Sequence, residues 1–171
     1  MNDMKKLMYV LLAALTLSFV ACNNQPVTPP EPEEPEIDDP TVPSTMQLFV
    51  DGIGEITKDK TITLHNALLS LSGELKMEIK GTIEGVDKIR VMVTRSTTDR
   101  EDELCAFGTC ATGDGETEQE FNFSVIDGSN TWFAHYTVPE ADHSPYTVKY
   151  KFINYSRVIT LTVVYDYQET E

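Results

Sequence analysis

The sequence predicts an all-β fold in which two antiparallel sheets pack face to face. Three observations lead to this prediction. Apolar and polar residues alternate with a period of two through several runs between residues 75 and 165. Turn-forming segments, such as Gly85-Val86-Asp87 and Asp127-Gly128-Ser129-Asn130, separate these runs. No segment shows a convincing apolar stripe at helical spacing, so we expect short strands and closed packing of two sheets.

The chain begins with an apolar leader, residues 1–21. Lys5 and Lys6 precede a fourteen-residue run, residues 7–20, that is interrupted only by Thr16 and Ser18. This run is shorter than the roughly 20 residues of a membrane-spanning helix and has the length of a secretory signal. It ends at Ala21-Cys22, which resembles the lipobox of bacterial lipoproteins. The resemblance implies cleavage before Cys22, lipidation and acylation there with a fatty acid such as palmitate, and an outer-membrane location. Ordinary signal cleavage would instead leave Cys22 as a free thiol.

A spacer comes next, which we predict to span residues 22–45. Residues 23–45 contain seven of the nine prolines and six acidic residues, without a basic one. Such a segment cannot bury enough apolar surface to offset its ordering entropy, and proline and like charges extend it. We therefore expect a disordered tether. Its acids also resemble the acidic signal for surface display in some lipoproteins of Bacteroides-type bacteria.

Residues 46–171 are predicted to form the folded domain. Residues 46–50 form a short first run, and residues 64–71 place leucines at helical spacing over too short a length for more than a loop or one turn. Residues 75–83 and 89–94 flank a turn and form a hairpin.

Four later runs complete a sandwich of seven or eight strands: residues 121–125, 132–138, 146–152 and 159–165. The segment Ser144-Pro145-Tyr146 resembles the start of the penultimate strand in fibronectin type III and immunoglobulin-like domains. The resemblance implies an antiparallel immunoglobulin-like β-sandwich in which the Tyr146 hydroxyl bonds to backbone upstream. Trp132 is in phase with apolar neighbours, which favours the core over an exposed carbohydrate-stacking position.

Cys105 and Cys110 enclose four residues, including Gly108, and an exported chain favours disulfides. We predict a structural disulfide; free thiols and a redox or metal role are the alternatives. The Cys loop, Phe133-Ala134-His135-Tyr136 and Thr162-Val163-Val164-Tyr165 resemble a β-sandwich domain of exported proteins from Bacteroides-type bacteria. That resemblance implies an accessory or adhesion-like module and supplies no catalytic residues.

The net charge of −15 argues against a nucleic-acid partner. The chain has no Gly-x-Ser-x-Gly elbow and no His-Glu-x-x-His motif, so we expect neither catalytic residues nor a metal centre. The strongest candidate for a binding loop is the acidic segment 96–120, pinned by the cysteine pair. Its candidate residues are Asp99, Glu101, Asp102 and Glu103, with a weak calcium site as the alternative to a solvated acidic face.

These observations predict a non-enzymatic, lipid-anchored protein of the bacterial cell envelope. It would bind a partner or serve as a structural accessory of a surface assembly. It would contact the membrane through its anchor, and its partner would be an envelope protein or a glycan. One alternative is a ligand-binding lipoprotein for glycan, haem or metal, for which His65, His135 and His143 are the axial histidine candidates. A second alternative is an envelope hydrolase.

Overall fold

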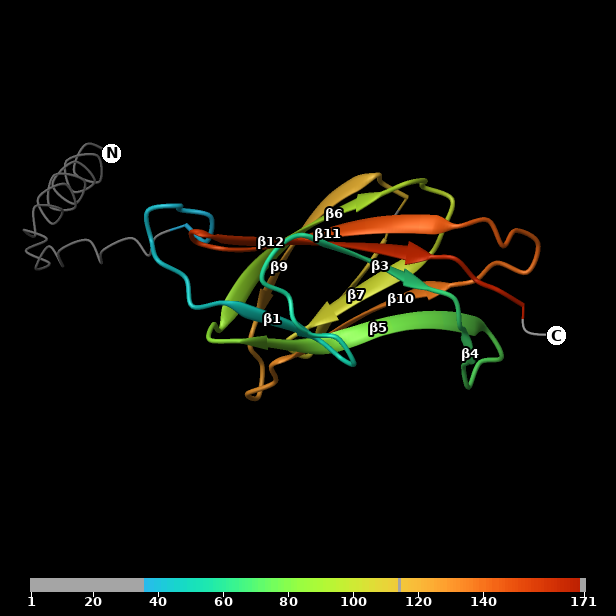
Figure 1. Ribbon diagram of the computed structural model, residues 1–171, viewed down its shortest axis with the longest axis horizontal. Helices are drawn as coiled ribbons and strands as arrows, with labels where there is room; N and C mark the ends of the chain where they lie inside the picture. The colour runs from blue at the N-terminus through green and yellow to red at the C-terminus, as the bar shows by residue number, and fades with distance from the viewer. Residues whose placement is uncertain (1–35, 114, 170–171) are drawn as a thin grey trace, which may run out of the picture. The chain divides into compact units, whose positions relative to one another are not determined.

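The computed structural model describes residues 36–113 and 115–169, and it confirms the predicted all-β, immunoglobulin-like sandwich (Figure 1). Sheet A contains, in spatial order, β2 (Gly54–Glu55), β1 (Gln47–Val50), β5 (Leu75–Glu84), β10 (Thr131–Thr137), β7 (Asp102–Ala106) and β8 (Thr109–Thr112), with β4 (Leu68–Leu69) paired to β5. Sheet B contains β3 (Lys60–Leu64), β12 (Arg157–Tyr165), β11 (Tyr146–Asn154), β6 (Lys88–Arg95) and β9 (Glu118–Ser124).

The described residues form twelve strands, more than the seven or eight expected. Five strands lie outside the predicted runs. Four of them, β2, β3, β4 and β8, are short edge segments without a fully buried residue, and the fifth, β7, lies inside sheet A between β10 and β8. Residues 64–71 contain the last residue of β3 and all of β4, and they form no helix. A helix here would need a core against which to bury its apolar face, but Leu68, Leu69 and Leu71 are exposed. Every strand pair is antiparallel except β3 with β12, whose parallel pairing closes one edge of sheet B.

The core fills the space between the two sheets with aromatic and branched side chains. Trp132 is buried, as predicted, and its Nε1 donates to the Phe49 carbonyl oxygen over 3.0 Å. Its ring lies 5.4 Å from that of Phe152, edge to face, which joins sheet A to sheet B. Gly81 is required at this crossing, since a Cβ there would overlap the Phe49 carbonyl. Burial of each large side chain contributes about 1.5–3 kcal/mol.

The packed chain begins before Met46, which corrects the predicted tether boundary at residue 45. The Val42 carbonyl accepts from the Ser156 amide over 3.0 Å, and Ile37 accepts similarly from Tyr155. Asp38 pairs with Arg90 of β6 at 2.6 Å. Residues 36–45 therefore lie against the β11–β12 turn because backbone bonds and this ion pair compensate for their polar composition. The predicted signal peptide, Cys22 and the rest of the tether lie outside the described residues.

The two ends of the sandwich differ in the segments that meet there. At the N-terminal end, residues 36–44 contact the β11–β12 turn (Figure 1). From that turn, β12 runs nine residues to Tyr165, which pairs with Tyr146 and Leu64 at the other end. We call this other end the distal end. Within the described part of the chain, no helix has the length and apolar character needed to cross a membrane.

Candidate functional site

Three connecting segments meet at the distal end of the sandwich. Strand β5 begins there, paired with β4 through Leu75 and Leu69, while β10 ends beside it with Thr137 opposite Lys76. Strand β6 also ends there, and β11 begins there. The β4–β5 turn, the β6–β7 loop and the β10–β11 loop are therefore neighbours, although they lie far apart in sequence.

Shallow hollows of about 340, 650 and 260 Å³ lie side by side on this end. Thr137 lines all three; Glu74, Glu101 and Pro139 each line two of them. The hollows therefore form one continuous surface, which we call the distal surface. It is contributed by residues of the segments 68–76, 99–103 and 135–143, with Thr112 and Gly113 at its edge.

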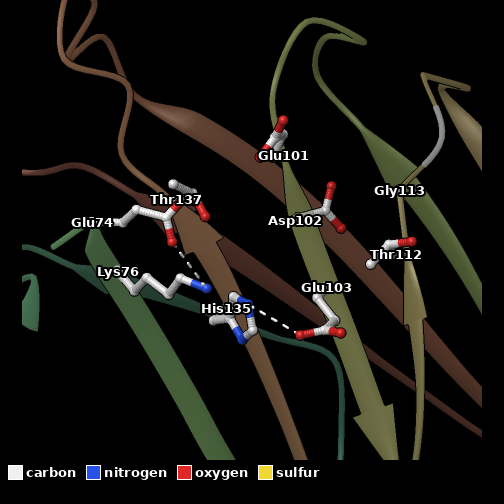
Figure 2. A pocket seen from close by; sticks show the side chains of 9 residues that line it. All are labelled: Glu74, Lys76, Glu101, Asp102, Glu103, Thr112, Gly113, His135 and Thr137. Carbon is white, nitrogen blue, oxygen red and sulfur yellow. Dashed lines mark ion pairs between the residues drawn. The ribbon is translucent and has the colours of Figure 1, made fainter. Parts of the chain in front are cut away.

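The first of these hollows is acidic and lies on the outer face of sheet A (Figure 2). The strand register places His135 of β10 directly opposite Glu103 of β7, and His135 Nε2 lies 3.2 Å from Glu103 Oε2. Across the hollow, Lys76 Nζ lies 3.7 Å from Glu74 Oε2. Glu101 adds a third carboxylate (Figure 2), so negative charge predominates in this hollow.

Asp102 borders the first hollow (Figure 2), but its carboxylate is not exposed as the predicted binding loop requires. Strand alternation turns its carboxylate inward, where it is fully buried. Arg95 donates to it through Nε at 2.6 Å and through Nη2 at 3.1 Å. The Tyr146 hydroxyl donates to the same carboxylate at 2.7 Å. This buried network joins β6, β7 and β11, so Asp102 is a structural residue.

The network also corrects the role predicted for Tyr146. Its hydroxyl bonds to the Asp102 side chain instead of to upstream backbone, because β7 presents an inward carboxylate at that position. Burial, followed by the bond to Asp102, raises the pKa of the Tyr146 hydroxyl far above its ordinary value. Burial opposes the charge of Arg95, but the contacts with Asp102 outweigh it and raise the pKa of the guanidinium.

Arg100 connects two of the distal segments, a role that motif searching did not reveal. Its guanidinium is nearly buried and donates to the Tyr136 hydroxyl at 3.2 Å and to the Asp142 carbonyl at 2.9 Å. It also pairs with the Asp142 carboxylate and reaches Ser144 Oγ at 3.0 Å. Bonds from the Ser144 hydroxyl and amide lower the pKa of Asp142. In the sequence, the only indication of this role is that Arg100 is the single basic residue within the acidic run 99–103.

Of the remaining predicted binding residues, Asp99 and Glu101 are exposed and Glu103 is half-buried. Asp99 and Glu101 line the hollow beside Arg100, whereas Glu103 faces His135 on the neighbouring strand. Since Asp102 points to the interior, the four predicted acids do not converge on one point. The arrangement therefore does not provide the clustered oxygens that a calcium site needs.

Three leucines add an apolar patch to the distal surface. Leu68 and Leu69 are 73% and 71% exposed, and Leu71 is fully exposed at 110%. They lie on and beside β4, which pairs only with the first residues of β5. The helical spacing noted for Leu68 and Leu71 did not indicate that they are exposed.

The predicted disulfide between Cys105 and Cys110 is present. The two residues lie directly opposite each other on β7 and β8, joined by a turn in which Phe107 and Gly108 have φ values of 54° and 84°. Glu103 Oε and the two sulfurs lie within 4.8 Å of one another. Because the sulfurs are bonded to each other, they offer no thiolate to a metal.

The three histidines have different neighbours. His65 Nδ1 lies 3.3 Å from an Asp166 carboxylate oxygen, and the His143 ring packs edge to face against Tyr167 at 5.1 Å. His135 and His143 line different hollows of the distal surface. Among the described residues, the group of three possible metal ligands, Glu103 with the two cysteines, includes no histidine.

Comparison with solved structures finds a distant likeness in fold. No family model matches the chain, and no curated protein matches it. The chain is similar to a solved structure described as the N-terminal domain of PorA, with 16% sequence identity and a TM-score of 0.48, over 70% of this chain and 96% of that one.

Proposed function

We propose that this chain is a lipid-anchored, non-enzymatic module of the bacterial outer membrane that binds another envelope protein through its distal surface. The observation that carries the proposal is the placement of the two ends. The chain preceding the sandwich joins it at the N-terminal end, whereas β4 lies at the distal end (Figure 1). The exposed leucines on and beside β4 and the three hollows also belong to the distal end.

This placement gives the end of the domain that an anchor at Cys22 would join. Residues 23–35 can extend over at most about 40 Å at roughly 3.1 Å per residue. The nine residues of β12 add about 30 Å between the two ends, at roughly 3.3 Å each. Anchoring through the N-terminal end would therefore leave the distal surface available to a partner.

The composition of the distal surface suits a protein partner. Stable interfaces combine an apolar centre with a polar rim. Leu68, Leu69 and Leu71 supply exposed apolar area of a kind that marks interaction sites. The hollow beside them carries Glu74, Glu101 and Glu103. The matching partner has an apolar pocket with basic residues around it.

Substitution at the two ends of the sandwich tests the proposal. Envelope complexes are extracted in mild detergent from cells that produce the wild-type chain or the variant Leu68→Ser/Leu69→Ser/Leu71→Ser, and the mass of the complex is measured. The matched control is Ile126→Ser/Val158→Ser, which removes exposed apolar residues at the N-terminal end.

We expect the distal variant to run as a free chain and the control to remain in the complex. A complex that survives the distal substitutions would refute the assignment of the surface. The anchor is tested separately: Cys22→Ala should release the protein from the membrane fraction or leave the uncleaved precursor, and the wild type should incorporate a fatty-acid analogue.

A further inference from the structure

A fourth hollow, of about 480 Å³, lies on the outer face of sheet B, apart from the distal surface. Its lining is entirely polar or charged: Asp59, Lys60, Thr61, Lys149, Lys151, Thr160 and Thr162. The register places Thr61, Thr162 and Lys149 in one row across β3, β12 and β11, with Thr160 and Lys151 in the next row. This basic hollow is unexpected in a chain with a net charge of −15.

The lysines of this hollow lack the carboxylate partners that several other bases have. Lys76, Lys80, Arg90 and Arg100 each form an ion pair. Among the residues that the structure describes, none of the carboxylates pairs with Lys60, Lys149 or Lys151, and all three lysines are exposed.

The repulsion between these ammonium groups favours an anion in the hollow. Lys149 and Lys151 lie on the same face of β11, about 6.6 Å apart along the strand. Like charges at this spacing repel, and a bound anion would relieve the repulsion. An isolated surface lysine has no such preference for an anion, whereas three lysines line this hollow.

We propose that the basic hollow binds an acidic glycan, a sugar chain that carries carboxylate or phosphate groups. The lysines would bind the anionic groups as point charges. The hydroxyls of Thr61, Thr160 and Thr162 can donate and accept hydrogen bonds with sugar hydroxyls.

The presence of Asp59 in the hollow favours a ligand that carries hydroxyl groups as well as anionic groups. Its carboxylate is fixed by a bond from the Thr160 amide at 3.0 Å and can accept from a sugar hydroxyl, whereas it would repel a polyanion without donors. The lining also lacks the apolar centre of a protein interface. The open sheet face suits an extended chain that lies across the strands.

The binding is tested by fluorescence anisotropy with the purified mature chain. The probes are labelled oligogalacturonate, which carries carboxylates, and a labelled phosphorylated mannan; neutral dextran is the control. We expect at least one charged probe to bind, with affinity that falls as salt rises, and dextran to remain free. Lys149→Gln and Lys151→Gln should each lower the affinity about two- to fivefold.

Two further variants separate charge recognition from general effects. Lys80→Gln removes the same charge from sheet A and should leave the affinity unchanged. Thr162→Val keeps every charge and the strand preference, and should weaken glycan binding about threefold through the lost hydroxyl. Unchanged thermal midpoints show that each variant is folded.

Three outcomes would overturn the inference. The first is that neither charged probe binds at low salt. The second is that dextran binds as well as the charged probes. The third is that polyglutamate or phosphatidylglycerol vesicles bind more tightly than both glycans, which would assign the hollow to an acidic peptide or a lipid headgroup. None of these outcomes bears on the distal surface, which is a different part of the molecule.

Discussion

The buried pair of Arg95 and Asp102 gives the sharpest prediction for stability. In the variant Asp102→Ala, Arg95 loses its Nε and Nη2 acceptors and Tyr146 loses the acceptor of its hydroxyl. The Arg95 side chain is 2% exposed, so its guanidinium depends on the Asp102 carboxylate to balance its charge. An uncompensated buried charge of this kind costs about 3–5 kcal/mol.

That loss is a large part of the total stability of a domain of this size, which is about 5–15 kcal/mol. It corresponds to a fall in the melting temperature of roughly 10–20 °C. The expected effect contrasts with a solvated acidic loop, in which substitution would change stability by about 0.5 kcal/mol or less. Glu101→Ala, one residue earlier and exposed, is the matched control and should fall in that smaller range.

Urea unfolding followed by tryptophan fluorescence measures the difference, since Trp132 is buried in the core. The double variant Arg95→Met/Asp102→Ala removes the orphaned charge and should be more stable than Asp102→Ala alone. If Asp102→Ala unfolds within 1 kcal/mol of the wild type, or if the double variant is no more stable than the single one, the reasoning about this network is wrong.

Three further predictions concern stability and order. Burial raises the pKa values of Tyr146, Tyr150 and Tyr165, so these hydroxyls stay protonated in the folded state while unfolded tyrosine ionises above about pH 10. Their contribution is complete below that pH, and above it the free energy of unfolding should fall by about 1.4 kcal/mol per pH unit for each; Tyr150→Phe should reduce this slope, and an unchanged slope counts against the assignment. Replacing both Cys105 and Cys110 by alanine should cost about 2 kcal/mol in urea unfolding, and two alkylatable thiols in the freshly purified wild type would contradict the disulfide. Limited proteolysis should cut within 23–35 and leave a core beginning near Glu36; cleavage between 38 and 44 would show that this segment does not pack.

The long strands could be predicted from the sequence because each buries one face. In β5, β6 and β9 to β12, apolar residues occupy alternate positions, and burial follows the same alternation. Strand β7 could not be predicted in this way. Its first inward-facing position holds Asp102, so residues 99–103 resemble an acidic loop in the sequence. A signal was available: Arg95 continues the inward positions of β6 and therefore requires an inward partner.

The distal surface could be predicted only in part. The acids of residues 99–103 pointed to one of its segments, and Asp99, Glu101 and Glu103 do line its hollows. The leucines beside β4 could not be recognised, since exposure depends on where the β4–β5 turn lies relative to the sheets. The basic hollow likewise depends on the pairing of β3 with β12, a parallel contact between segments about a hundred residues apart.

The central claim is that an anchored domain meets a partner at its distal end, and site-specific cross-linking in cells tests it most directly. A photoreactive residue is placed at Leu69 on the distal surface or at Val158 at the N-terminal end, both of them exposed. We expect a discrete adduct with an envelope protein from position 69 and none from position 158, with loss of the adduct in the Cys22→Ala background. Adducts from position 158 alone, or equal adducts from both positions, would contradict the claim.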